Sequence, residues 1–352
     1  MMYLPAWLRR QRAQQLMNFG MVSTVKAEKI GSRRKTSCPE MPFDVVSDVY
    51  LAGAPPIACR SLDPPFEVVE ESMRENADLS GREHGFIKRL LRHDLRPRLA
   101  QPLGEAMCLY LQFNTPGDWI YQQVPKVLLA EEVGFRGKYV VPPGRVVTET
   151  LALVGVTPDR LVEHTDQIWK VGKLWVPPWS HYATHLFTAY PDLLVKTRDA
   201  ILRGLRPGPP RHRTYVSRNR PGVSRQIVNE PEFKALIERY DFAEYFCEDH
   251  PVSERVRHFA ESEATIGPNG SGFINTLFMP AGALAVELFS PARHEDPWSL
   301  VPAKILKQRY YEIMPYFQGN QGYAYGNDIF ANIALIEQTL EQEFSRSGRR
   351  AS

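Results

Sequence analysis

The sequence predicts an α/β protein with two domains. Its 352 residues are 43% hydrophobic and 24% charged, an ordinary globular composition that is sufficient for two hydrophobic cores. Between residues 44 and 143, short apolar runs typical of strands alternate with segments of helical pattern. From residue 211 onward the order strand, loop, helix occurs twice. This alternation is typical of parallel sheets whose strands are joined by crossover helices.

The first domain is expected to alternate strands with helices. Its strands are predicted at residues 44–51, 106–113, 138–142 and 171–176. Its helices are predicted at residues 119–133, with a break or kink near Pro125, and at residues 146–154. The proline-rich run 177–210 contains one predicted helix, at about 191–203, and should hold the connection between the domains.

The second domain is expected to begin with a strand at residues 213–217. The loop after it carries Arg218, Arg220 and Arg225 and no acidic residue. A helix follows, with Asn229 as its N-cap. Guanidinium groups can bind phosphate through two parallel hydrogen bonds, so this loop is a candidate anion site. One of the three arginines is readily explained as a solvated side chain, but Arg218 and Arg225 together are less so.

Residues 264–280 form the second strand-loop-helix unit, and its loop is rich in glycine. The loop carries Gly267, Gly270 and Gly272, and a helix is expected from about residue 271 to 279. The start of a helix offers unpaired backbone N–H groups and a partial positive charge, which favour a bound phosphate. A tight turn without a ligand is the alternative, because Asn275 replaces the third glycine of the dinucleotide fingerprint and no Walker lysine follows.

A carboxylate lies in the next predicted strand. Residues 283–289 are apolar apart from Glu287. A carboxylate in a buried strand needs a partner. Either an arginine of the fold or a ribose hydroxyl of a ligand would serve.

These residues, in this order, resemble the family 61 glycosyltransferases, which include capsular-polysaccharide-type bacterial enzymes and eukaryotic xylosyl- and N-acetylglucosaminyltransferases. The resemblance covers roughly residues 105 to 345. Upstream, residues 117–126 (Gly-Asp-Trp-Ile-Tyr-Gln-Gln-Val-Pro-Lys) resemble the family segment in which His-Trp precedes Leu-Pro-Arg. In the second domain the resemblance rests on Arg218, Arg225, Asn229, Glu230, Glu254, the run Gly267-Pro268-Asn269-Gly270-Ser271-Gly272, Asn275, Phe278, Gly282, Glu287 and Pro291.

Two positions depart from the family pattern. Asp118 stands where the family usually has histidine before Trp119, and Asn269 stands where the common glycine motif begins with histidine. An asparagine side chain can still donate hydrogen bonds to phosphate, so donor binding is expected to be kept.

The resemblance implies the GT-B architecture, in which two Rossmann-like α/β domains with parallel sheets face each other across a cleft. The long amphipathic helix at residues 328–344 should pack back on the first domain. The expected divisions are a basic tail at 1–40, an acceptor-side domain at 41–185, a linker region at 186–210, a donor-binding domain at 211–315 and a C-terminal segment at 316–352.

The resemblance also implies a metal-independent, inverting transferase that moves a sugar from a nucleotide-sugar donor to a glycan or lipid-linked acceptor, in synthesis of a cell-surface polysaccharide such as a capsule. The nucleotide sugar is a co-substrate, and no cofactor is expected. Asp118 is the candidate catalytic base, and the alternative for it is a structural role as a helix N-cap. Glu287 is expected to hold the ribose. The other residues expected to bind the donor are Arg218, Arg225, Asn269, Gly270, Ser271, Gly272 and Asn275.

No metal site is expected. The sequence contains no Asp-x-Asp motif, and its four cysteines include no Cys-x-x-Cys pair, so neither a zinc site nor a disulfide framework is indicated. His181 and His185 have the spacing of a helical metal pair. However, they closely follow Pro177 and Pro178 and have no well-placed carboxylate near them.

The N-terminus is strongly basic. Residues 1–37 hold eight basic residues and one acidic residue, a net charge of +7, whereas the whole chain carries +3. A helix at residues 2–17 could lie on an anionic membrane surface, and a basic tail without fixed structure is the favoured alternative. The segment lacks the apolar run of a spanning helix or signal peptide. We therefore expect a cytoplasmic protein and consider peripheral contact with the inner membrane face through residues 1–37.

Two other classes of function remain open. The absence of both family histidines is compatible with a catalytically inactive protein that binds a nucleotide sugar. The basic tail is compatible with a scaffold or nucleic-acid-binding protein, whose affinity would fall steeply with salt. The uninterrupted match to the family core favours the transferase, with no nucleic-acid partner.

Overall fold

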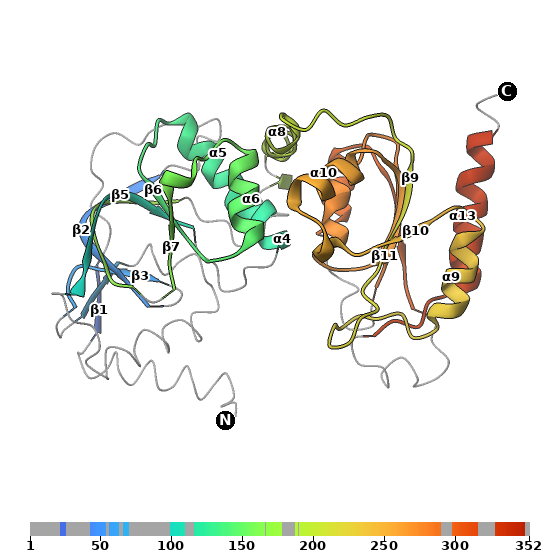
Figure 1. Ribbon diagram of the computed structural model, residues 1–352, viewed down its shortest axis with the longest axis horizontal. Helices are drawn as coiled ribbons and strands as arrows, with labels where there is room; N and C mark the ends of the chain where they lie inside the picture. The colour runs from blue at the N-terminus through green and yellow to red at the C-terminus, as the bar shows by residue number, and fades with distance from the viewer. Residues whose placement is uncertain are drawn as a thin grey trace. The chain divides into compact units, whose positions relative to one another are not determined.

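The chain divides into two compact units, residues 1–186 and 187–352. Both are built from strands and helices, which confirms the predicted α/β class (Figure 1). The computed structural model describes residues 22–25, 43–53, 56–62, 66–69, 99–109, 116–165, 167–177, 187–188, 190–289, 298–315 and 328–348.

The first unit contains an eight-stranded mixed sheet with the strand order β1-β4-β3-β2-β8-β5-β6-β7. The half from β8 to β7 is parallel, as expected, whereas β2 runs antiparallel to both β3 and β8. The short connection between β2 and β3 explains why these two strands are antiparallel, because a parallel crossover needs a dozen or more residues. The strands are β1 (Val22–Val25), β2 (Asp44–Ala52), β3 (Ile57–Cys59), β4 (Phe66–Val69), β5 (Gln101–Cys108), β6 (Lys138–Val141), β7 (Leu161–Glu163) and β8 (Trp169–Val176).

Strand β1 lies inside the stretch that we expected to be a basic tail. It pairs in parallel with β4, from Val22 opposite Phe66 to Val25 opposite Val69. Part of the predicted tail is therefore a strand of the first sheet. The predicted helix at residues 2–17 and the pair His181 and His185 lie outside the described residues.

The helices of the first unit connect its parallel strands. The predicted helix at 119–133 is confirmed, and it consists of a π-helical turn followed by α-helix. Pro125 lies in the first turn of the α-helical part, so the change from π-helix to α-helix falls beside it, where the sequence predicted a break. The helices are α4 (Pro116–Asp118), η2 (Trp119–Gln123), α5 (Val124–Glu132), α6 (Arg145–Leu153) and η3 (Pro158–Arg160).

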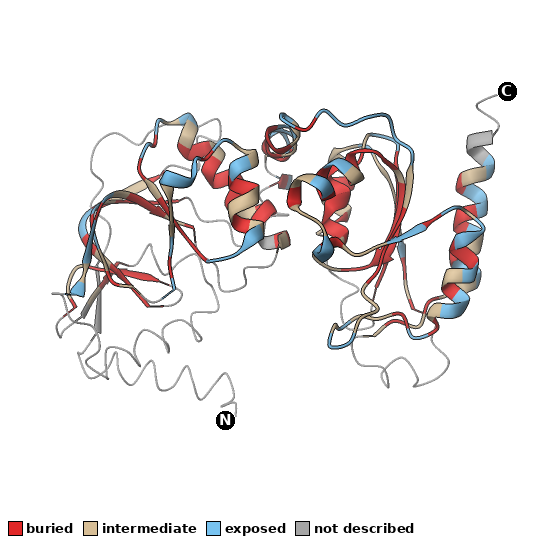
Figure 2. Cartoon of the chain, viewed as in Figure 1, coloured by how far each residue is buried: buried red, intermediate tan, exposed pale blue. Residues whose placement is uncertain are grey.

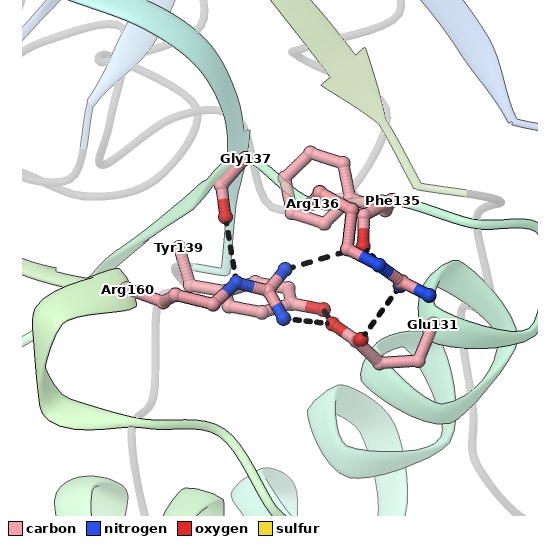
Figure 3. A network of polar contacts seen from close by, with 6 residues as sticks. All are labelled: Glu131, Phe135, Arg136, Gly137, Tyr139 and Arg160. Carbon is pink, nitrogen blue, oxygen red and sulfur yellow. Dashed lines mark hydrogen bonds and ion pairs between the residues drawn. The ribbon is translucent and has the colours of Figure 1, made fainter.

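A polar network ties the end of α5 to the segment before β7 (Figure 3). Glu131 accepts hydrogen bonds from Arg160 Nη1 at 2.7 Å and from the Tyr139 hydroxyl at 2.5 Å. Arg160 Nε also donates to the carbonyl of Gly137 at 3.0 Å. Burial, with Glu131 beside the hydroxyl, raises the pKa of Tyr139 above its ordinary value, so this phenol remains a donor. The network fixes the two crossover connections of the parallel half.

The second unit has a five-stranded sheet in the order β10-β9-β11-β12-β13. All its strand pairs are parallel, as the alternation of strands and helices predicted. Helices α9 and α13 lie on one face of this sheet, and α8 and α10 lie on the other (Figure 1). The strands are β9 (His212–Val216), β10 (Ala243–Tyr245), β11 (Ser262–Pro268), β12 (Leu284–Leu288) and β13 (Arg309–Ile313).

The core of the second unit lies on both faces of this sheet. Every residue of β12 is buried, and β11 is buried along nearly its whole length (Figure 2). Helix α8, which we expected within the connection between domains, packs on this unit, because Arg198 Nε donates to the carbonyl of Leu277 at 3.1 Å. The helices are α8 (Pro191–Leu202), α9 (Glu230–Glu238), η4 (Cys247–Asp249), α10 (Val252–Ala260), η5 (Phe273–Phe278), α11 (Leu300–Ile305) and α13 (Ile333–Gly348).

The C-terminal helix α13 packs on the second unit, which corrects our expectation that it would return to the first domain. Ile336 and Leu340 are fully buried in the core that contains strands β11 and β12. Glu343 accepts hydrogen bonds from Arg309 and, at 2.5 Å, from the Tyr311 hydroxyl, both on β13. The apolar stripe of the helix was recognised from the sequence, but its partner surface was not.

The segment before α13 is held by Asn229. This residue precedes α9, as predicted, but its side chain makes no capping hydrogen bond. Its Oδ1 instead accepts from the backbone N–H of Ala331 at 2.8 Å, and its Nδ2 donates to the carbonyl of Ala331 at 3.1 Å.

Among the described residues, no helix has the length and apolar character needed to cross a bilayer.

Candidate functional site

The glycine loop lies at the carboxyl edge of the second sheet, where β9, β11 and β12 end. At Gly267 a side chain would meet the carbonyl oxygen of Val216 at 2.6 Å, so glycine allows β9 and β11 to approach closely. Asn269 N–H donates to the carbonyl of Leu288 at 2.8 Å and fixes the start of the loop. Ligands of parallel α/β sheets bind at this edge, so the loop is in the expected place for a binding site.

Two arginines converge on Gly270. A Cβ atom built on this glycine would lie 2.9 Å from Arg225 Nη1 and 3.0 Å from Arg218 Nη1. Arg225 Nη1 donates to the Asn269 carbonyl at 2.7 Å and to Asn269 Oδ1 at 3.2 Å. Arg218 Nε donates to the carbonyl of Ser224 at 2.9 Å. The structure thus brings together Arg218, Arg225 and the loop, and both arginines are partly exposed.

Three backbone donors accompany the two guanidinium groups. The N–H groups of Gly270, Ser271 and Gly272 make no hydrogen bond within the part of the chain that the structure describes. All three residues are partly exposed. Successive N–H groups of this kind form a concave site for an anion, and adjacent positive charge strengthens it. The arrangement can bind a phosphate or diphosphate.

The predicted helix after the loop is shorter than expected. It is a six-residue 3-10 helix, η5, that begins at Phe273. We expected an α-helix from about residue 271 whose dipole would help to hold an anion. So short a segment has little dipole, and the loop N–H groups and the arginines carry the positive potential here.

Asn275, which we expected to bind the donor, has a structural role in this conformation. It is 4% exposed, and its Nδ2 donates to the carbonyl of Gly272 at 2.7 Å. The Cys247 thiol also donates toward this carbonyl, at 3.7 Å, and burial raises the pKa of this thiol to about 12. Asn275 and Cys247 therefore hold the loop from below.

The third arginine of the upstream loop points elsewhere. Arg220 makes a two-point ion pair with Asp249, of which the Nη1–Oδ1 distance is 2.7 Å, and its guanidinium lies 3.7 Å from the ring centroid of Phe246. The hydrogen bond from Arg220 holds the pKa of Asp249 below its ordinary value. Of the three arginines, Arg220 is the one with a structural role.

Glu287 lies beneath the loop and does not reach the surface. Its side chain is 0% exposed, so it cannot hold a ribose as we expected. Its Oε1 accepts from Asn269 Nδ2 at 2.9 Å and from Ser299 Oγ at 3.1 Å, and its Oε2 accepts from the Tyr310 hydroxyl at 2.6 Å. Neither an arginine nor a ribose is needed to explain a carboxylate that has these three donors. The sequence contained no signal for Ser299 or Tyr310, which lie on other segments.

Asn269 also differs from our expectation. We expected its side chain to donate to phosphate, but it is 3% exposed, and its amide N–H donates to Glu287. Its Oδ1 faces Arg225. Asn269 therefore lies behind the arginine and not on the ligand side of the loop.

Asp118 is the last residue of α4, directly before the π-helical turn η2. The helical run begins at Pro116, so Asp118 does not precede the helix as an N-cap would. π-Helical turns occur frequently at functional sites. In this turn the indole N–H of Trp119 and the side-chain amide of Gln123 are buried and have no hydrogen-bond partner in the described part of the chain.

Among the described residues, no group of three His, Cys, Asp or Glu side chains is placed to hold a metal ion.

Comparisons with known proteins identify a family. A model of the family described as Glycosyltransferase 61 matches residues 63–286, which is more than half of the chain. A solved structure of E. coli heptosyltransferase WaaC with ADP is similar at 9% identity, over 68% of this chain and 100% of that chain, with a TM-score of 0.32. A similarity this low carries no argument about the function of this chain. A search of curated proteins found no match.

Proposed function

The chain belongs to glycosyltransferase family 61, and we propose that it transfers a sugar from a nucleotide-sugar donor to a hydroxyl group of a glycan or lipid-linked acceptor, with the donor diphosphate held on the glycine loop of the second unit. The observation that carries this proposal is the convergence of Arg218 and Arg225 on Gly270, beside three backbone N–H groups without partners among the described residues. Two cationic side chains from the upstream loop and three backbone N–H groups of the glycine loop, all partly exposed, offer a diphosphate positive charge and hydrogen-bond donors.

The chemistry requires positive charge at this position. As the bond between the sugar anomeric carbon and the diphosphate oxygen breaks, the electron pair leaves with the nucleoside diphosphate. Arginines and amides already in place stabilise that charge without reorganisation. A hydrogen bond to a charged group contributes about 1.5–3 kcal/mol, so two arginines can supply several kcal/mol. We therefore propose that these residues supply the charge stabilisation and that the reaction does not depend on a metal ion.

The acceptor hydroxyl must lose its proton as its oxygen bonds to the anomeric carbon. We propose that the Asp118 carboxylate takes this proton and that the reaction inverts the anomeric configuration, because it uses one base and one displacement. General-base assistance contributes about 10²- to 10⁴-fold in rate. Asp118→Asn keeps the size of the side chain, and it should bind donor normally but transfer sugar at least 100-fold more slowly. Normal turnover in this variant would reject the catalytic role.

A catalytically inactive nucleotide-sugar-binding protein is the second candidate. It is favoured by Asn269, which stands at a family histidine position and is fully engaged with Glu287 and Arg225. Both candidates require donor binding, and only the transferase releases diphosphate. The role in capsule or other surface-polysaccharide synthesis is part of our proposal for the transferase.

The decisive experiment is a binding and turnover screen. Nucleoside diphosphates and nucleotide sugars are tested by thermal shift and calorimetry, since a ligand at 100 times its dissociation constant stabilises a protein by about 2.7 kcal/mol. Responding donors are then incubated with polysaccharide and lipid-linked acceptors, and released diphosphate is measured. Binding that is lost in Arg218→Ala and Arg225→Ala supports the site, and binding with no release supports the inactive protein. A protein that binds none of these ligands contradicts both.

A further inference from the structure

We propose that Glu287 is a positioning residue for the diphosphate site and that it acts through Asn269 on the Arg225 guanidinium. This inference rests on the function proposed above, and it assigns to Glu287 a role that needs no contact with the donor. The chain of hydrogen bonds runs from Tyr310 on β13, through Glu287 on β12 and Asn269 in the glycine loop, to Arg225 in the upstream loop.

The charge of Glu287 determines which way the Asn269 amide faces. An ionised carboxylate only accepts hydrogen bonds, so the Nδ2 of Asn269 must turn toward it. The observed distance of 2.9 Å from Asn269 Nδ2 to Glu287 Oε1 agrees with this orientation. The Oδ1 atom of the same amide then faces Arg225.

Asn269 consequently presents two acceptors to a single guanidinium nitrogen. Arg225 Nη1 lies 2.7 Å from the Asn269 carbonyl oxygen and 3.2 Å from Asn269 Oδ1. If the Asn269 amide were reversed, its NH2 group would face the Arg225 guanidinium. Two hydrogen-bond donors would then face each other, and their repulsion would displace the guanidinium. The carboxylate therefore keeps Arg225 next to Gly270, where its Nη1 atom would be 2.9 Å from an added Cβ.

The burial of Glu287 supports a specific role. Burying a carboxylate costs several kcal/mol unless hydrogen bonds compensate. The neighbouring positions of β12 are all apolar, and a valine there would satisfy the sheet without compensation. Tyr310 and Ser299 supply two further donors, which keep the carboxylate fixed below the loop.

The test compares two buried carboxylates that each accept a tyrosine hydroxyl from β13. Glu287→Gln removes the charge below the loop, and Glu343→Gln removes that of the carboxylate bonded to Tyr311, on α13. Binding of inorganic pyrophosphate is measured by calorimetry. We expect the dissociation constant to rise at least 10-fold in Glu287→Gln and to change less than 2-fold in Glu343→Gln.

A double-mutant cycle with Arg225→Ala separates positioning from general damage. If Glu287 acts through Arg225, Glu287→Gln has no further effect on pyrophosphate binding once Arg225 is alanine, whereas independent structural damage would add. The pair Tyr310→Phe and Tyr311→Phe repeats the comparison with milder changes, in case Glu287→Gln does not fold. A rise of about 3-fold is expected for Tyr310→Phe alone.

A crystal structure of Glu287→Gln provides a readout that needs no ligand. We expect Arg225 Nη1 to move away from the Asn269 carbonyl, because a neutral glutamine no longer requires the Nδ2 of Asn269 to face it. An unchanged guanidinium, or equal effects of the two glutamine variants on binding, overturns the positioning role. A wild-type protein that binds no pyrophosphate overturns the proposed function instead, and the crystal structure then decides the role of Glu287.

Discussion

Replacement of Gly270 by alanine tests the convergence of the two arginines most directly. The added Cβ atom would lie 2.9 Å from Arg225 Nη1 and 3.0 Å from Arg218 Nη1. Ordinary contacts begin near 3.4 Å, so each guanidinium must move by about 0.5 Å. That movement would lengthen the 2.7 Å bond from Arg225 to the Asn269 carbonyl to about 3.2 Å, the long end of the hydrogen-bond range, and so weaken it.

The expected loss can be estimated from these contacts. One hydrogen bond to a charged group contributes about 1.5–3 kcal/mol, which corresponds to a 10- to 150-fold change in a dissociation constant. We expect pyrophosphate and nucleoside diphosphates to bind Gly270→Ala at least 10-fold more weakly than the wild type. Isothermal titration calorimetry at low ionic strength measures this loss.

A matched control removes the effect of backbone strain. Gly270 has φ +148°, where an alanine is strained by about 1–3 kcal/mol whatever surrounds it. Gly282 has φ +78° and nothing within 4 Å of an added Cβ, so Gly282→Ala is also strained but meets no arginine. Both variants should lose stability, and only Gly270→Ala should lose affinity. Wild-type affinity in Gly270→Ala would show that the guanidinium groups do not define the site.

Three further predictions concern other contacts. Arg225→Lys keeps the charge but loses the planar fork, so the dissociation constant of pyrophosphate should rise about 10-fold, and calorimetry that shows no change would contradict a two-point contact. Leu340→Ala empties a fully buried position and should lower the free energy of unfolding by about 2–5 kcal/mol in urea titrations. The control Leu335→Ala changes a side chain that is 38% exposed on the same helix, and it should lower the free energy of unfolding by less than about 1 kcal/mol. Equal losses in the two variants would contradict the packing of the Leu340 face of α13 on the core. Burial, with a smaller contribution from neighbouring histidines, lowers the pKa of His258 from 6.5 to about 4. The unfolded chain therefore binds a proton at this histidine at a higher pH than the folded chain does. The free energy of unfolding consequently falls as the pH drops from 6.5 toward 4. His258→Asn should flatten the melting temperature between pH 7 and pH 5, and an unchanged slope would assign it to other groups.

The sequence predicted the second unit better than the first. Strands that alternate with helices of ordinary length predict a parallel sheet, and the sheet of the second unit confirms that prediction. The first unit contains β2 and β3, whose short connection forces an antiparallel pair, so alternation alone did not describe it. Strand β1 was missed because a four-residue strand inside a basic stretch has no distinctive pattern.

The candidate site shows what residue types alone can predict. Arg218 and Arg225 were selected because a loop with three arginines and no acid is typical of an anion site, and the structure brings both of them to Gly270. The partner of Arg220 is Asp249, 29 residues further along the chain, and the sequence does not indicate that pairing. Glu287 was recognised as a buried carboxylate in need of a partner, and its partners are Asn269 of the glycine loop, Ser299 and Tyr310.

The backbone at Arg225 adds a consequence for any attempt to engineer this protein. Its φ of +65° lies in the left-handed region, which costs glycine and asparagine less conformational energy than it costs arginine. Neither glycine nor asparagine carries a guanidinium group. A substitution of Arg225 that relieves the backbone strain would therefore also remove the positive charge at this position. Selection for thermal stability alone would therefore tend to remove the guanidinium group that we propose binds the donor diphosphate.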